Sequence, residues 1–161
     1  MNAEHSASAW KALLDADLNA RYWRYMGLRY TRREGWAKIF LASTASATVA
    51  SWSFWAELKL LWQSLSVIAA LISVAIPIID APRKIATMTE AQAAWLQLMH
   101  EYDDLWRSRA SLGERAFVAT LSSLREREVE VSKKTATLPS DDTDLAERCF
   151  AEVVTSRGLS V

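Results

Sequence analysis

The side chains able to carry out chemistry are few and scattered in this sequence. One cysteine, Cys149, and two histidines, His5 and His100, lie far apart along the chain. His100-Glu101 and Asp103-Asp104 have metal-ligand chemistry, but on one helix they fall on several faces, which favours a solvated charged surface. The four glycines form no phosphate-binding loop. We therefore expect no catalytic residue, no cofactor and no metal site, and a protein that is not an enzyme.

Cysteine content and net charge narrow the function classes further. A single cysteine excludes an intramolecular disulfide and predicts that the soluble parts are cytosolic. Because Cys149 lies among Leu145, Phe150 and Val153, we interpret it as a small packing residue. The formal net charge of zero gives no basic surplus, so no direct nucleic-acid binding is expected.

Two uncharged stretches dominate the middle of the chain. Residues 60–79 contain no charged residue and no histidine, and about 20 apolar residues suffice to cross a bilayer. Residues 39–55 are also uncharged, although Ser and Thr recur there. These stretches predict an all-α membrane protein in which a two-helix transmembrane hairpin, about 36–55 and 60–79, continues into a cytoplasmic helical bundle or coiled coil. The alternatives are two core helices of a soluble bundle and, less well fitted to this position, a signal peptide.

Basic and aromatic residues flank the predicted spans. The positive-inside rule places both termini in the cytoplasm and predicts a multi-pass protein of the bacterial inner membrane. The basic residues that set this topology are Arg29, Arg32, Arg33, Lys38, Arg83 and Lys84. Trp36, Trp52, Trp55 and Trp62 are the expected interfacial anchors.

The charged parts of the chain have the periodicity of helices. Residues 1–35 are predicted as a cytoplasmic amphipathic helix, residues 36–79 as the hairpin, and residues 80–161 as a long helix and a C-terminal helix. The long helix is expected from about Lys84 to Lys134, with Gly113 as a point of division. Ser140 or Asp141 is the expected N-cap of the last helix, and Gly158 is expected to cap its end.

Small residues form two rows on the first predicted span. The rows are Ala42, Ser46 and Ala50, and Ser43, Ala47 and Ser51. Such rows allow close helix contacts, either within the hairpin or between protomers, and would make this span the lining of any pore. Asp80 is an acid at the predicted membrane edge. It is expected to pair with Arg83 or Lys84, or else to lie near a pore mouth.

The whole arrangement resembles the SLATT family of bacterial two-transmembrane effector proteins of anti-phage conflict systems. The resemblance rests on patterns spread over nearly the full chain: Arg21-Tyr-Trp-Arg-Tyr25 through Tyr30, Ala47-Thr-Val-Ala-Ser51, Ile79-Asp80, His100-Glu-Tyr-Asp-Asp-Leu105, Leu138-Pro-Ser-Asp-Asp142 and Leu145-Ala-Glu-Arg-Cys-Phe-Ala-Glu-Val153. It implies a homo-oligomer in the lipid bilayer that permeabilises or depolarises the membrane when a sensor or a nucleotide-signal-producing partner triggers it. The chain departs from this pattern in having no recognisable ligand-sensing domain.

Two other functions are compatible with the same layout. A regulated ion channel or transporter is the first, although the turn at residues 56–59 contains no recognisable selectivity filter. The second is a membrane-anchored scaffold without a pore, whose long helix recruits a cytosolic partner.

Overall fold

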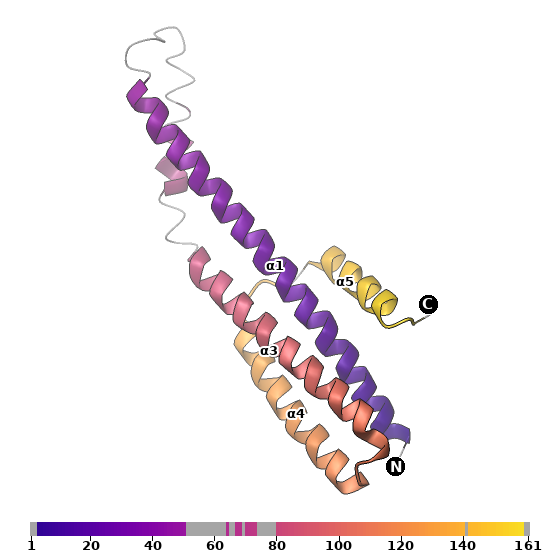
Figure 1. The fold of residues 1–161 in the computed structure, drawn as a ribbon. Coiled ribbons are helices and arrows are strands. Elements are labelled where there is room, and N and C mark those ends of the chain that lie inside the picture. Colours follow the sequence, from indigo (N-terminus) through magenta and orange to yellow (C-terminus); the bar gives the residue numbers. More distant parts are fainter. Residues whose placement is uncertain are drawn as a thin grey trace. The chain divides into compact units, whose positions relative to one another are not determined.

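The computed structural model describes residues 3–50, 64, 67–68, 70–73, 80–140 and 142–159, and the regular structure within them is helical. The helices are α1 (Ala3–Ala50), α3 (Ala81–Arg107), α4 (Glu114–Thr135) and α5 (Thr143–Ser156), with a 3₁₀ turn, η2 (Ser108–Ala110), after α3 (Figure 1). They divide into two compact units. The first contains Met1–Gly27 and Ala86–Val161, and the second contains Leu28–Ile85.

The first unit is a three-helix bundle with a fourth helix against it. α1 packs antiparallel to α3, since the rings of Trp10 and Trp106 lie 5.1 Å apart. α3 and α4 form an antiparallel pair (Figure 1), in which the Tyr102 hydroxyl donates to Glu128 at 2.9 Å. The core is made of apolar side chains that recur at three- and four-residue spacing: Ala9, Leu13, Ala16, Met88, Trp95, Leu98, Tyr102, Leu105, Phe117, Leu121 and Leu124.

The chain reverses direction between α3 and α4. The helix expected from about Lys84 to Lys134 is therefore two helices, and Gly113 is the N-cap of the second. Glycine is a poor residue for a helix interior, and the 3₁₀ turn before it tightens the exit from α3. The reversal buries the apolar faces of α3 and α4 against each other within the first unit, as one continuous helix could not do.

α5 is a short helix with defined ends. The Asp142 side chain accepts from the Leu145 backbone N–H at 3.0 Å, one or two residues after the expected cap. At the other end Gly158 has φ +65°, and the N–H of Leu159 donates to the carbonyl of Val154 at 3.0 Å. The left-handed glycine and the bond from Leu159 to Val154 are features of a Schellman motif, which ends the helix at a glycine.

The second unit contains the end of α1 and the start of α3. Within it Lys38 pairs with Glu34 at 2.7 Å, one helical turn away. Asp80 has a positive φ of 47° in the turn before α3, and its carboxylate lies 3.9 Å from the Arg83 guanidinium. This ion pair is one of the two alternatives expected for Asp80.

The predicted transmembrane hairpin is wrong as a description of this structure. Among the described residues no helix is both long and apolar enough to cross a bilayer. A stretch of ~20 residues of α1 that ends at Ala50 includes Arg33, Glu34 and Lys38, which are costly in hydrocarbon. The multi-pass inner-membrane location is corrected with it. The lipid-bilayer partner and the pore-lining role of the first predicted span stay predictions. Most of the second predicted span, 60–79, lies outside the described residues.

Candidate functional site

Among the described residues, the buried charged side chain is that of Asp17 on α1. Its side chain is 6% exposed, and it faces the end of α5. One carboxylate oxygen accepts from Arg21 Nε at 2.8 Å, and the other lies 3.1 Å from Nε and 3.0 Å from Nη2 of Arg157. A buried carboxylate needs such partners because desolvation penalises its charged form. Asp17 therefore ties α1 to the residue that follows α5.

Arg157 also reaches a third helix. Its Nη1 lies 3.4 Å from Oδ1 of Asp103 on α3, and Asp103 pairs in addition with Arg107 at 2.7 Å. One guanidinium thus joins α1, α3 and the C-terminal end of α5. Its planar fork of donors suits this bridging role better than the point charge of a lysine would.

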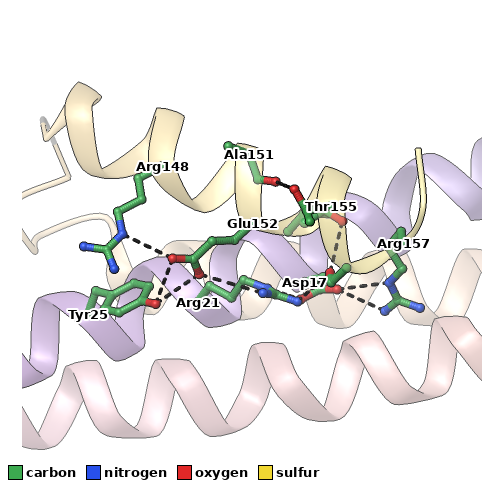
Figure 2. A network of polar contacts seen from close by, with 10 residues as sticks. Asp17, Arg21, Tyr25, Arg148, Ala151, Glu152, Thr155 and Arg157 are labelled. Atoms are coloured by element: carbon green, nitrogen blue, oxygen red, sulfur yellow. Dashed lines mark hydrogen bonds and ion pairs between the residues drawn. The ribbon is translucent and has the colours of Figure 1, made fainter. Parts of the chain in front are cut away.

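A second group of polar contacts lies one to two turns further along α1 (Figure 2). The Tyr25 hydroxyl lies 2.9 and 3.0 Å from the two carboxylate oxygens of Glu152 on α5 and donates to them. Arg148 donates to Glu152 at 3.2 Å, and its guanidinium lies 4.9 Å from the centre of the Tyr25 ring. Arg21 also donates to the Ser156 hydroxyl at 2.9 Å. Because Arg21 pairs with Asp17 and lies 3.8 Å from Glu152, it connects the two groups of contacts.

We call seven of the residues in these two groups the clasp: Asp17, Arg21, Tyr25, Asp103, Arg148, Glu152 and Arg157. Burial alone would raise the pKa of Glu152, but the hydrogen bonds from Tyr25 and Arg148 and the charges of Arg148 and Arg21 outweigh it, so the pKa lies below its ordinary value. The hydrogen bond to Asp17, opposed by burial, raises the pKa of Arg21. Both groups are therefore charged at neutral pH.

Beneath the clasp, α5 buries an apolar stripe. Leu145, Cys149, Val153 and Val154 are its buried residues. Cys149 has no exposed surface, and burial raises the pKa of its thiol, so it is unreactive while α5 is docked. This agrees with the packing role expected from the sequence.

A groove of about 520 Å³ opens beside the clasp, between α1, α3 and α5. Its lining from α1 includes Arg24, and its lining from α3 includes Leu96 and Met99. Leu96 is 42% exposed, so it presents apolar surface to the groove. The groove therefore combines apolar and charged surface.

The charged groups of the clasp are engaged with one another. The carboxylates of the clasp are paired with guanidiniums, and Cys149 has no histidine beside it among its described interactions. In the part of the chain that the structure describes, no cluster of His, Cys, Asp and Glu could hold a metal ion. His100 is exposed, while Glu101 pairs with Arg127, and Asp103 belongs to the clasp.

The residues proposed from the sequence for the membrane site lie elsewhere. Trp36, Ala42 and Ser43 are exposed on α1, as are Arg29, Arg32, Arg33 and Lys38. Arg83 is exposed and Lys84 is half-buried at the start of α3. Ser46, Ala47 and Ala50 belong to α1, but their side chains lie outside the described part, as do Ser51, Trp52, Trp55 and Trp62 altogether.

The sequence analysis missed the clasp. Asp17 and Arg157 are 140 positions apart, so no local pattern links them. Two signals were nevertheless present: the i,i+4 pairs Asp17/Arg21 and Arg148/Glu152, and an acid on the apolar side of α1 between Leu13 and Ala20. Comparison with protein-family models, curated proteins and solved structures gives no match for this chain.

Proposed function

We propose that this protein is a non-enzymatic, signal-receiving helical scaffold in which α5 is a docked, releasable element. When closed, α5 covers the face of α1 beside the α3 groove. When released, it exposes that face to a protein partner. Of the functions considered from the sequence, this keeps the scaffold that recruits a partner and drops its membrane anchor.

One observation carries the proposal: α5 is held at its C-terminal end by a buried carboxylate shared between two guanidiniums. Ion pairs of this kind contribute less net stability than an apolar contact of the same volume. They fix the position of α5 along α1, and the loss of one charged partner weakens them strongly. α5 has 14 residues, and helices of that length are marginal in water without tertiary contacts. Its docking and its folding are therefore one event, separable from the bundle core.

The chain contains its own reporter for this event. Cys149 is the only cysteine in the sequence and is fully buried on α5, so a thiol reagent can label it only after α5 opens. We expect Arg157→Gln to raise the rate of native-state labelling about tenfold or more, because it removes charge-assisted bonds to two other helices.

A matched variant separates local opening from global unfolding. Tyr102→Phe removes the hydrogen bond to Glu128 between α3 and α4, a bond in which no clasp residue takes part. It should lower the free energy of unfolding and leave the Cys149 labelling rate unchanged. If the Cys149 labelling rate instead rises in both variants in proportion to the loss of unfolding free energy, α5 does not open by itself and the proposal fails.

Homo-oligomerisation is a second part of the proposal. On α1, within the second unit, Leu28, Trp36 and Ile39 are 47%, 72% and 57% exposed and lie on one side of the helix. Several exposed apolar side chains on one side of a helix can form a patch, and large apolar patches commonly mark an interface. Sedimentation should find an oligomer that the double variant Trp36→Ser, Ile39→Ser dissociates. A monomeric wild-type chain would contradict this part.

The upstream trigger stays a proposal as well. A sensor or a nucleotide-signal-producing partner, in a bacterial anti-phage system, is what the resemblance implies for the signal. Genes beside this one test that role directly, because a neighbouring nucleotidyltransferase or sensor gene would support it.

A further inference from the structure

The groove between α1, α3 and α5 has the size of a small-molecule site. Its volume of about 520 Å³ lies within the ~300–1,000 Å³ typical of ligand pockets. Three helices line it, and each contributes polar atoms: Asp17, Arg21, Arg24 and Tyr25 from α1, Gln92 from α3, and Glu152, Ser156 and Arg157 from α5 or directly after it.

The charges in the lining do not cancel. Three arginines face two carboxylates, which leaves one positive charge in excess. Arg21 and Arg157 both pair with Asp17, and Arg21 also lies 3.8 Å from Glu152. Arg24 is different, because within the described residues no carboxylate pairs with it. The excess positive charge is therefore located on Arg24.

An apolar strip lies on the α3 wall of the same groove. Leu96 and Met99 are three residues apart, so they share one face of α3, and the polar Gln92 lies one turn before Leu96 on that face. Leu96 is 42% exposed and Met99 is half-buried. A ligand that covered this strip would remove apolar surface from water, which is favourable in proportion to its area.

We propose that this groove binds a small amphipathic organic anion. Its carboxylate would pair with the Arg24 guanidinium, whose parallel N–H donors match the two oxygens of a carboxylate. Its hydrocarbon part would cover Leu96 and Met99. A cationic or a neutral molecule of the same shape gains the apolar contact alone.

The same geometry makes the ligand a regulator of α5, a step that rests on the proposed function. Glu152, Ser156 and Arg157 line the groove only while α5 is docked. Arg24, Leu96 and Met99 remain in place when α5 is released, so regulation requires that the ligand also contact this α5 wall. A ligand that for this reason binds only the closed form shifts the equilibrium by a factor of one plus its concentration divided by Kd. At a concentration of 100 Kd, native-state labelling of Cys149 should slow about 100-fold.

Octanoate is the probe for binding, with octylammonium and octanol as head-group controls. Calorimetric titration of the full chain should find octanoate bound at least about tenfold more tightly than either control, given the usual strength of a charge-assisted hydrogen bond. Acetate, which lacks the hydrocarbon, should bind as weakly as the controls. Equal affinity for octanoate and octylammonium would overturn the site.

Two exposed arginines give a matched pair of variants. Arg24→Gln should weaken octanoate binding about tenfold or more, whereas Arg115→Gln on α4, outside the groove, should leave it unchanged. No loss in Arg24→Gln, or no binding at millimolar octanoate, would overturn the site and leave the ligand-free Cys149 results standing. Binding without slower labelling would overturn the regulatory step alone.

Discussion

Arg157, the residue directly after α5, places its Nη2 atom 3.0 Å from Oδ2 of Asp17 on α1. The two residues are 140 positions apart, and both side chains are largely excluded from solvent. This contact fixes where the end of α5 lies on the bundle.

The first prediction concerns the charge of Asp17. Asp17→Asn keeps the size of the side chain but leaves the guanidiniums of Arg21 and Arg157 without their shared partner. We expect the free energy of unfolding, measured by urea denaturation, to fall by about 2–4 kcal/mol. Asp15→Asn, at an exposed position of the same helix, should change it by less than about 0.5 kcal/mol. Equal effects would show that the buried charge is not the cause.

A double-mutant cycle tests the contact between Tyr25 and Glu152. Tyr25→Phe and Glu152→Gln each weaken the same pair of hydrogen bonds, so their combined effect should fall short of additivity by about 1 kcal/mol. The matched cycle uses Glu147→Gln, an exposed acid of α5, and should be additive with Tyr25→Phe. Additivity in both cycles would rule out coupling between α1 and α5 at this point.

The pH dependence follows from the lowered pKa of Glu152. Because the docked form holds this carboxylate ionised more firmly than the unfolded chain does, the unfolded state binds more protons in this range. The contribution to stability is therefore complete above the ordinary pKa, near 4.5, and is lost as the pH falls through the lower pKa of the folded state. The difference in unfolding free energy between wild type and Glu152→Gln should shrink as the pH falls from 6 to below the lowered pKa of Glu152. A constant difference would contradict the prediction.

Glycine at the end of α5 is required by its backbone conformation. Gly158 has φ +65°, which an alanine adopts only at a cost of about 1–2 kcal/mol. Gly158→Ala should therefore speed Cys149 labelling about fivefold or more. Gly113→Ala, where φ is −66° and no atom beyond the adjoining residues lies within 4 Å of the added Cβ, should not. Similar rates for the two variants would argue against a Schellman-anchored α5.

Local features of the fold were predictable from the sequence. The apolar periodicity of residues 8–33 lies within α1, and Gly158 and the acids near Asp142 marked the ends of α5, because caps depend on neighbouring residues only. Gly113 also marked the division between α3 and α4. The reversal at Gly113 follows instead from contacts such as Tyr102 with Glu128, which are formed by tertiary packing.

The predicted membrane hairpin was wrong because residues 39–55 were treated as a separate uncharged segment, although the segment begins within a longer helix that carries charges. α1 is continuous from Ala3 to Ala50, so residues 39–50 of the uncharged segment are the end of a helix that carries Glu34 and Lys38. The clasp was missed because its residues come together only in the folded structure. Its members are ordinary surface charges in sequence, and only the packing of α5 on α1 brings Glu152 and Arg157 to them.

Native-state hydrogen exchange measured residue by residue tests the central claim, the independent opening of α5, most directly. The backbone amides of Cys149, Val153 and Val154 should exchange through an opening that needs clearly less free energy than that of Leu98, Tyr102 and Leu121 in the bundle core. Arg157→Gln should lower the opening free energy of the α5 amides further and leave that of the bundle-core amides unchanged. A single opening free energy shared by α5 and the bundle core, in wild type and variant alike, would contradict the account.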